Sequence, residues 1–70
     1  MLMSILKEIK KKTNLNTALQ YELESLPEIG TTLARRIINN RPYQSIYDLK
    51  KVKGIGDGTI KLLKNEVSVE

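Results

Sequence analysis

Two glycine-containing turns in this chain have the composition of an anion site made from backbone N–H groups. Glycine and threonine gather at both, as Gly30, Thr31, Thr32, Gly54, Gly56, Gly58 and Thr59. A tight turn that leads into a helix presents several N–H groups without intrahelical acceptors, and the helix dipole adds partial positive charge there. Glycine lets another backbone approach closely. The predicted chemistry is the binding of a phosphate oxygen, with the amides of Gly56, Gly58 and Thr59 as donors.

Charged side chains flank the two turns unequally. Lys53 and Lys61 lie on either side of the second turn and could pair with adjacent phosphates. Residues 47–64 contain two acids and five bases, a net charge of +3, whereas residues 21–38 contain three acids and two bases, a net charge of −1. Attraction to a polyanion follows the local charge. We therefore expect the second turn to contribute most of the affinity.

The first turn differs from the second at one important position. Glu28 stands where Gly54 stands in the second turn, and a carboxylate disfavours a bound phosphate unless it points away. Contributions from the first turn are expected from the amides of Thr31 and Thr32, with Arg35 one turn further along the helix.

Both turns belong to an internal repeat that must position them. When the sequence is aligned with itself, Tyr21–Gly30 matches Tyr47–Gly56. The Tyr, Leu, Ile and Gly residues of the two segments are identical. The apolar positions also continue to match past the glycine. Each copy predicts a helix, a tight turn and a second helix. Since one copy is too short to bury its own apolar face, we expect the two to pack together about a pseudo-two-fold axis. The isoleucine within each turn should fill the core.

The helix signals predict an all-α domain of four to five short helices. The expected helices cover residues 18–25, 31–40, 45–52 and 57–65. Asn16 or Thr17 is the predicted N-cap of the first and Ser45 that of the third. Pro27 ends the first helix because proline disfavours helical geometry in the residue before it.

Apolar spacing assigns the core faces of these helices. On the first helix, Leu19, Leu23 and Leu26 share one face. The ends of the chain are less defined. Residues 1–13 form either a basic arm or a short amphipathic helix over residues 3–12. Residues 67–70 are expected to be extended or loosely packed. Residues 14–70 form the helical domain.

These motifs resemble the tandem helix-hairpin-helix family, most closely the ComEA-type DNA-receptor domain of bacterial competence proteins. The segments that carry the resemblance are Asn14–Ala18, Leu23–Ala34, Arg36–Ile38, Pro42–Ser45 and Leu49–Gly56. The resemblance implies a SAM-domain-like fold and sequence-independent binding of double-stranded DNA through hairpins at about residues 26–31 and 52–57. Its binding positions match Gly30, Thr31 and Thr32 in the first hairpin and Gly54, Gly56, Gly58 and Thr59 in the second.

A weaker similarity points to a different function. The short connector Asn39–Pro42 resembles that of the photosystem II extrinsic protein U family, whose members use this fold to bind protein. Glu28 and the uneven charge also suit a protein-interaction or self-association module. DNA binding and protein binding therefore both stay open as functions of this sequence.

Composition argues against several other classes of protein. The 70 residues include no cysteine and no histidine, so the commonest metal ligands and general base are absent, and we expect no catalytic residues, metal or cofactor. Three tyrosines are the only aromatic residues, which disfavours a stacking platform for single strands. The sequence shows neither a signal peptide nor a membrane span, so we expect a cytoplasmic protein that does not contact membranes.

Overall fold

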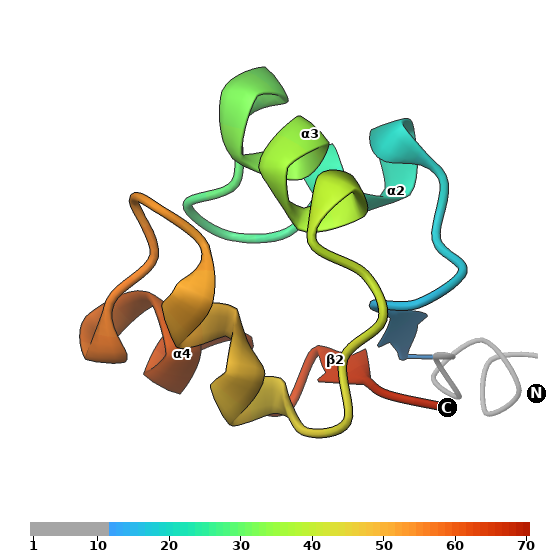
Figure 1. Ribbon diagram of the computed structural model, residues 1–70. Helices are drawn as coiled ribbons and strands as arrows, with labels where there is room; N and C mark the ends of the chain where they lie inside the picture. Colours follow the sequence, from blue (N-terminus) through green and yellow to red (C-terminus); the bar gives the residue numbers. More distant parts are fainter. Residues whose placement is uncertain (1–11) are drawn as a thin grey trace, which may run out of the picture.

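The computed structural model describes residues 12–70 and confirms the all-α class (Figure 1). The elements follow in the order β1 (Thr13–Asn14), α2 (Gln20–Glu24), α3 (Thr31–Asn39), the 3-10 helix η1 (Ile46–Lys51), α4 (Asp57–Leu63) and β2 (Val67–Ser68). The possible helix at residues 3–12 lies outside the described residues, except for Lys12.

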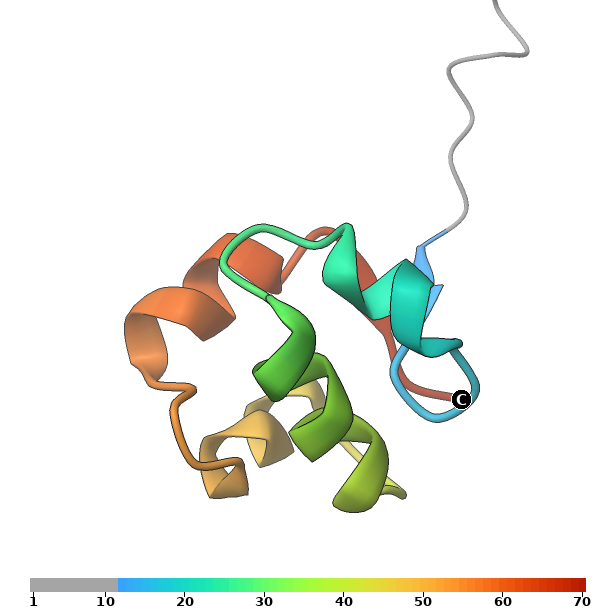
Figure 2. The ribbon, with the colours of Figure 1, turned by 90° about the horizontal axis from the view of Figure 1, so that it is seen from above.

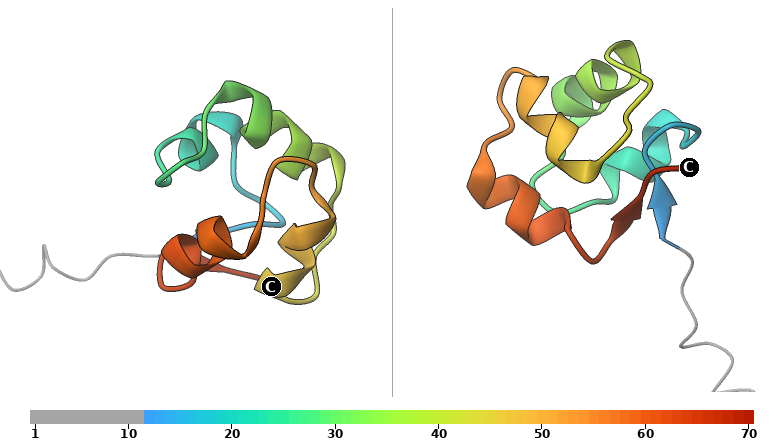
Figure 3. Two further views of the ribbon diagram at one scale, coloured as in Figure 1. Left: turned by 90° about the vertical axis from the view of Figure 1, so that its left-hand side faces the viewer. Right: turned by 60° about the horizontal axis from the view of Figure 1, so that its bottom comes forward.

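The four helices form two hairpins that share one core. α2 packs against α3, and η1 packs against α4; seen from above and from two further sides, the hairpins face one another (Figures 2 and 3). Both copies of the repeat bury the same positions, all at most 6% exposed: Leu23 and Leu49, Leu26 and Val52, Ile29 and Ile55, Ala34 and Ile60, Ile37 and Leu63. The prediction that Ile29 and Ile55 fill the core is confirmed.

The first helix is shorter than predicted and has a different cap. Its N-cap is Leu19, not Asn16 or Thr17. Leu19 supplies no side-chain cap, and Glu22 Oε1 accepts the Leu19 N–H at 2.7 Å. Leu19 is also 58% exposed, so the prediction that it faces the core is wrong. As the residue before the helix, Leu19 does not follow the helical periodicity that places Leu23 inside.

The third and fourth helices begin where predicted but differ in type or length. Ser45 caps η1 as expected, its Oγ accepting the Tyr47 N–H at 3.1 Å. η1 is a 3-10 helix because only six residues separate Ser45 from the extended Val52, and short segments favour the tighter turn. α4 ends at Leu63, earlier than the predicted end at Asn65.

The two ends of the described chain pair as a parallel two-residue ladder that the sequence analysis did not predict. Thr13 lies opposite Val67, and Asn14 opposite Ser68. Val67 is 3% exposed, so the tail is packed rather than loose. The ladder holds the start of the first hairpin against the end of the second.

Polar side chains brace the connector between the hairpins. Asn16 Oδ1 accepts the Tyr43 N–H at 2.6 Å, and Asn16 Nδ2 donates to the Tyr43 carbonyl at 2.9 Å. Arg41 donates to the carbonyls of Leu15 and Ala18. The Tyr43 hydroxyl is buried and donates to the Ile37 carbonyl at 2.7 Å. These bonds hold the connector against residues 15–18 and against α3.

Candidate nucleic-acid interface

The second helix of each hairpin begins with the same backbone geometry. Gly30 is the N-cap of α3, with φ −99° and ψ −168°, and Gly56 is the N-cap of α4, with φ −116° and ψ −172°. Ala34 donates to the Gly30 carbonyl at 2.9 Å, and Ile60 donates to the Gly56 carbonyl at 3.1 Å. The repeat thus builds two equivalent helix N-termini.

Residues at both helix starts lie at the surface. Thr31 and Thr32 are exposed at the start of α3, Gly58 is exposed in the first turn of α4, and Thr59 beside it is half-buried. N–H groups in a first helical turn have no intrahelical acceptor, and glycine N-caps supply no side-chain oxygen. Both turns lie at the left of Figure 1, away from β2 and the C-terminus. The predicted donors are therefore available to an external anion.

Three of the four glycines are not required by the packing. A Cβ atom built on Gly30, Gly56 or Gly58 would meet nothing within 4 Å. The extended backbone of Gly30 and Gly56 is open to any residue, and a glycine at position 58 weakens α4. These residues leave open space directly over the helix starts, as a site approached by a bulky ligand requires.

The fourth glycine, Gly54, has a structural role. Its φ is +101°, and an added Cβ would lie 2.9 Å from Leu33 Cδ2. Next to it, Arg36 Nη1 donates to the Lys53 carbonyl at 2.9 Å. The second turn is therefore braced against α3 of the first hairpin. Arg36 was not among the predicted site residues, because its partner is a main-chain carbonyl in the other hairpin.

In the first turn, Glu28 adopts a positive φ of 66°. Its side chain is exposed, so the carboxylate is in solvent rather than in the core. The Glu28 carboxylate therefore makes the electrostatic potential at the first turn more negative, but it does not occupy the core side of the turn.

The predicted cationic residues are exposed around the turns. Lys53 precedes Gly54, while Arg35 and Lys61 occupy equivalent positions on α3 and α4. An acid, Asp57, begins α4, and its Oδ1 lies 3.0 Å from Lys50 Nζ. The Lys50 ammonium group therefore offsets the negative charge of Asp57 beside the start of α4.

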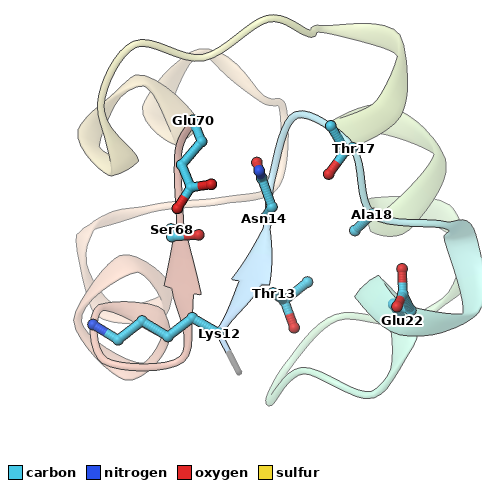
Figure 4. Close-up of a pocket in the computed structure, with 8 residues that line it drawn as sticks. All are labelled: Lys12, Thr13, Asn14, Thr17, Ala18, Glu22, Ser68 and Glu70. Atoms are coloured by element: carbon cyan, nitrogen blue, oxygen red, sulfur yellow. The ribbon is translucent and has the colours of Figure 1, made fainter. Parts of the chain in front are cut away.

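A separate cavity lies at the other end of the molecule. Figure 4 shows a hollow of about 480 Å³ beside β1 and β2, lined by Lys12, Thr13, Asn14, Thr17, Ala18, Glu22, Ser68 and Glu70. Its charged residues are of both signs, and it lies at the strand end of the molecule rather than at the hairpin turns. Within residues 12–70, no group of acidic side chains could hold a metal ion. No helix in the same range is long and apolar enough to cross a membrane.

Two glycine-turned helical hairpins related by a repeat define the architecture of this protein. A family model described as the helix-hairpin-helix motif matches residues 8–68. The chain belongs to the helix-hairpin-helix family, and the resemblance stated from the sequence is confirmed.

Several curated proteins contain a similar segment. The chain is 41% identical over 51 residues to a "Deoxyribonuclease" of Thioalkalivibrio sp. (strain K90mix), covering 73% of this chain and 14% of that protein. It is 34% identical over 61 residues to "ComE operon protein 1" of Bacillus subtilis (strain 168), covering 81% and 30%. It is 33% identical over 64 residues to human "Endonuclease/exonuclease/phosphatase family domain-containing protein 1", covering 86% and 11%. The chain thus spans less than a third of each relative.

Proposed function

We propose that this domain is a non-catalytic module that binds double-stranded DNA through phosphate contacts from two hairpins. The observation that carries the proposal is the pair of equivalent helix starts at Gly30 and Gly56. At both, the first residues of the helix are exposed and a glycine leaves open space that the fold does not need. The names of the relatives, a deoxyribonuclease among them, support DNA as the ligand.

Binding of this kind is independent of base sequence. The donors are backbone N–H groups and lysine side chains, and their acceptors are phosphate oxygens, which are the same at every base pair. Two helix starts on one side of the molecule suit two phosphate groups of one duplex. Few phosphates are neutralised by so small a surface, so we expect a dissociation constant of about 1–100 µM at physiological salt.

The second hairpin contributes more of the affinity. Lys53 and Lys61 flank its turn, whereas Glu28 lies in the first turn. The brace from Arg36 to the Lys53 carbonyl also fixes the second turn before DNA arrives, which lowers the ordering cost of binding.

A titration of labelled duplexes tests the proposal. Fluorescence anisotropy with three short duplexes of equal length and unrelated sequence should give equal affinities at each of two salt concentrations. Affinity should fall as salt rises, because bound phosphates release counterions. Lys53→Gln with Lys61→Gln should weaken binding more than Arg35→Gln. The proposal is wrong if there is no salt-sensitive binding at tens of micromolar protein.

A protein-binding module is the alternative, and exposed apolar side chains favour it. Leu19 and Tyr21, both near the start of α2, are 58% and 69% exposed. Light scattering separates the two functions: a mass that rises with protein concentration, together with no duplex binding, would support the protein-binding module.

A further inference from the structure

Each hairpin carries a shallow groove between its two helices. The groove between η1 and α4, here the η1–α4 groove, has a volume of about 320 Å³ and is lined by Tyr47, Lys50, Asp57, Ile60, Lys61 and Lys64. In the first hairpin, a groove of about 300 Å³ is lined by Gln20, Arg35, Ile38 and Asn39. The alignment of the two repeat copies places Arg35 on Lys61 and Ile38 on Lys64, so the repeat builds a groove in the same place twice.

The two grooves differ in charge. Lys64 in the η1–α4 groove replaces Ile38, and Lys50 stands at the position of Glu24. Lys50 pairs with Asp57 at 3.0 Å, whereas Lys61 and Lys64 make no ion pair with residues 12–70. Lys61 lies in α4, and Lys64 is its C-cap with helical backbone angles, so their i, i+3 spacing places both side chains on one face of the helix. The η1–α4 groove therefore presents two positive charges on one wall.

The opposite wall supplies a hydrogen-bond donor. Tyr47 is 56% exposed at the start of η1 and lines the same groove. Its phenolic O–H can donate to an anionic oxygen. Two ammonium groups and one hydroxyl that line the same groove suit a singly charged phosphodiester with several acceptor oxygens.

We propose that the η1–α4 groove holds a second phosphate group of the same DNA molecule, through Lys61, Lys64 and Tyr47. This inference rests on the proposed function. The groove is continuous with the hairpin site, because Asp57, the first residue of α4, lines it. A DNA strand with one phosphate held at the amides of α4 would therefore continue over Lys61 and Lys64. Continuity with that site favours DNA over an acidic peptide.

Lys64→Gln and a matched control test the contribution of the groove. Lys51→Gln makes the same charge change from an exposed position outside the groove, where Lys51 Nζ lies 5.2 Å from the Tyr43 ring centroid. In duplex titrations, Lys64→Gln should reduce the slope of log affinity against log salt by about 0.9, the loss of one phosphate contact. Lys51→Gln should change that slope by less than half as much. Thermal unfolding checks that both variants remain folded.

A second pair of variants tests the hydroxyl. Tyr47→Phe should weaken duplex binding about two- to threefold, the loss of one hydrogen bond with a net worth of about 0.5 kcal/mol, whereas Tyr21→Phe at the equivalent position should not. If the wild type binds duplex but Lys64→Gln and Lys51→Gln give equal salt slopes, the groove proposal is wrong. Displacement of the duplex by poly-glutamate at equal charge concentration would also overturn it, in favour of an acidic protein partner. If the wild type does not bind duplex at all, the proposed function itself fails.

Discussion

Glu28 and Gly54 occupy the same place in the two hairpin turns, and both have a positive φ, 66° and 101°. The turn geometry is therefore a property of the repeat rather than of glycine alone. A non-glycine residue in this conformation costs about 1–2 kcal/mol, so the first turn is strained where the second is not.

Relief of this strain gives the first prediction. Glu28→Gly should be more stable to urea unfolding than Glu28→Ala by about 1 kcal/mol, because both remove the charge but only glycine removes the Cβ atom. Equal stability of the two variants would show that the left-handed backbone at position 28 is not strained.

Gly54 should respond in the opposite way. Gly54→Ala places a Cβ atom 2.9 Å from Leu33 Cδ2 at a φ of +101°, and should cost about 2 kcal/mol in urea unfolding. Gly58→Ala is the control, since its Cβ has open space; it should leave stability unchanged or raise it by up to about 1 kcal/mol. Similar losses in both variants would contradict the assigned role of Gly54.

The repeat explains why so much of the fold could be predicted. Its two copies align apolar positions such as Leu23 with Leu49, and these pairs form the core. Equivalent acids also proved informative: Glu22 accepts the Leu19 N–H, and Asp48 accepts the Ser45 N–H at 3.2 Å. Both acids therefore help to cap helices, although the predicted caps were Asn16 or Thr17 and Ser45.

Features that depend on distant partners could not be predicted. A strand as short as Thr13–Asn14 cannot show alternation, and its partner, Val67–Ser68, lies near the other end of the chain. The bond from Arg36 to the Lys53 carbonyl depends on how the hairpins pack. The predicted binding residues stay predictions, although the structure exposes Gly30, Gly56 and Gly58 as binding requires.

Alkaline titration of Tyr43 gives a third prediction. Burial raises the pKa of Tyr43 to about 12, against a smaller lowering effect of Arg41. Because this pKa lies above the value of about 10 expected in the unfolded chain, neutral Tyr43 stabilises the fold fully below pH 10. That contribution is lost as the pH rises through 12. The unfolding temperature should fall more steeply across this range in the wild type than in Tyr43→Phe. Parallel pH profiles would contradict a buried, neutral hydroxyl.

DNA approaches the amides of the second hairpin, in this proposal, through the space left by its glycines, and duplex binding by Gly58→Leu is the decisive measurement. Leucine favours the helix more than glycine does, and a Cβ atom at position 58 meets nothing within 4 Å, so the unfolding temperature should not fall. Asn39→Leu, at the exposed end of α3, controls for added apolar surface. We expect affinity at least about fivefold weaker for Gly58→Leu, a loss of about 1 kcal/mol, and little change for Asn39→Leu. A folded Gly58→Leu protein that binds duplex as tightly as the wild type would contradict it.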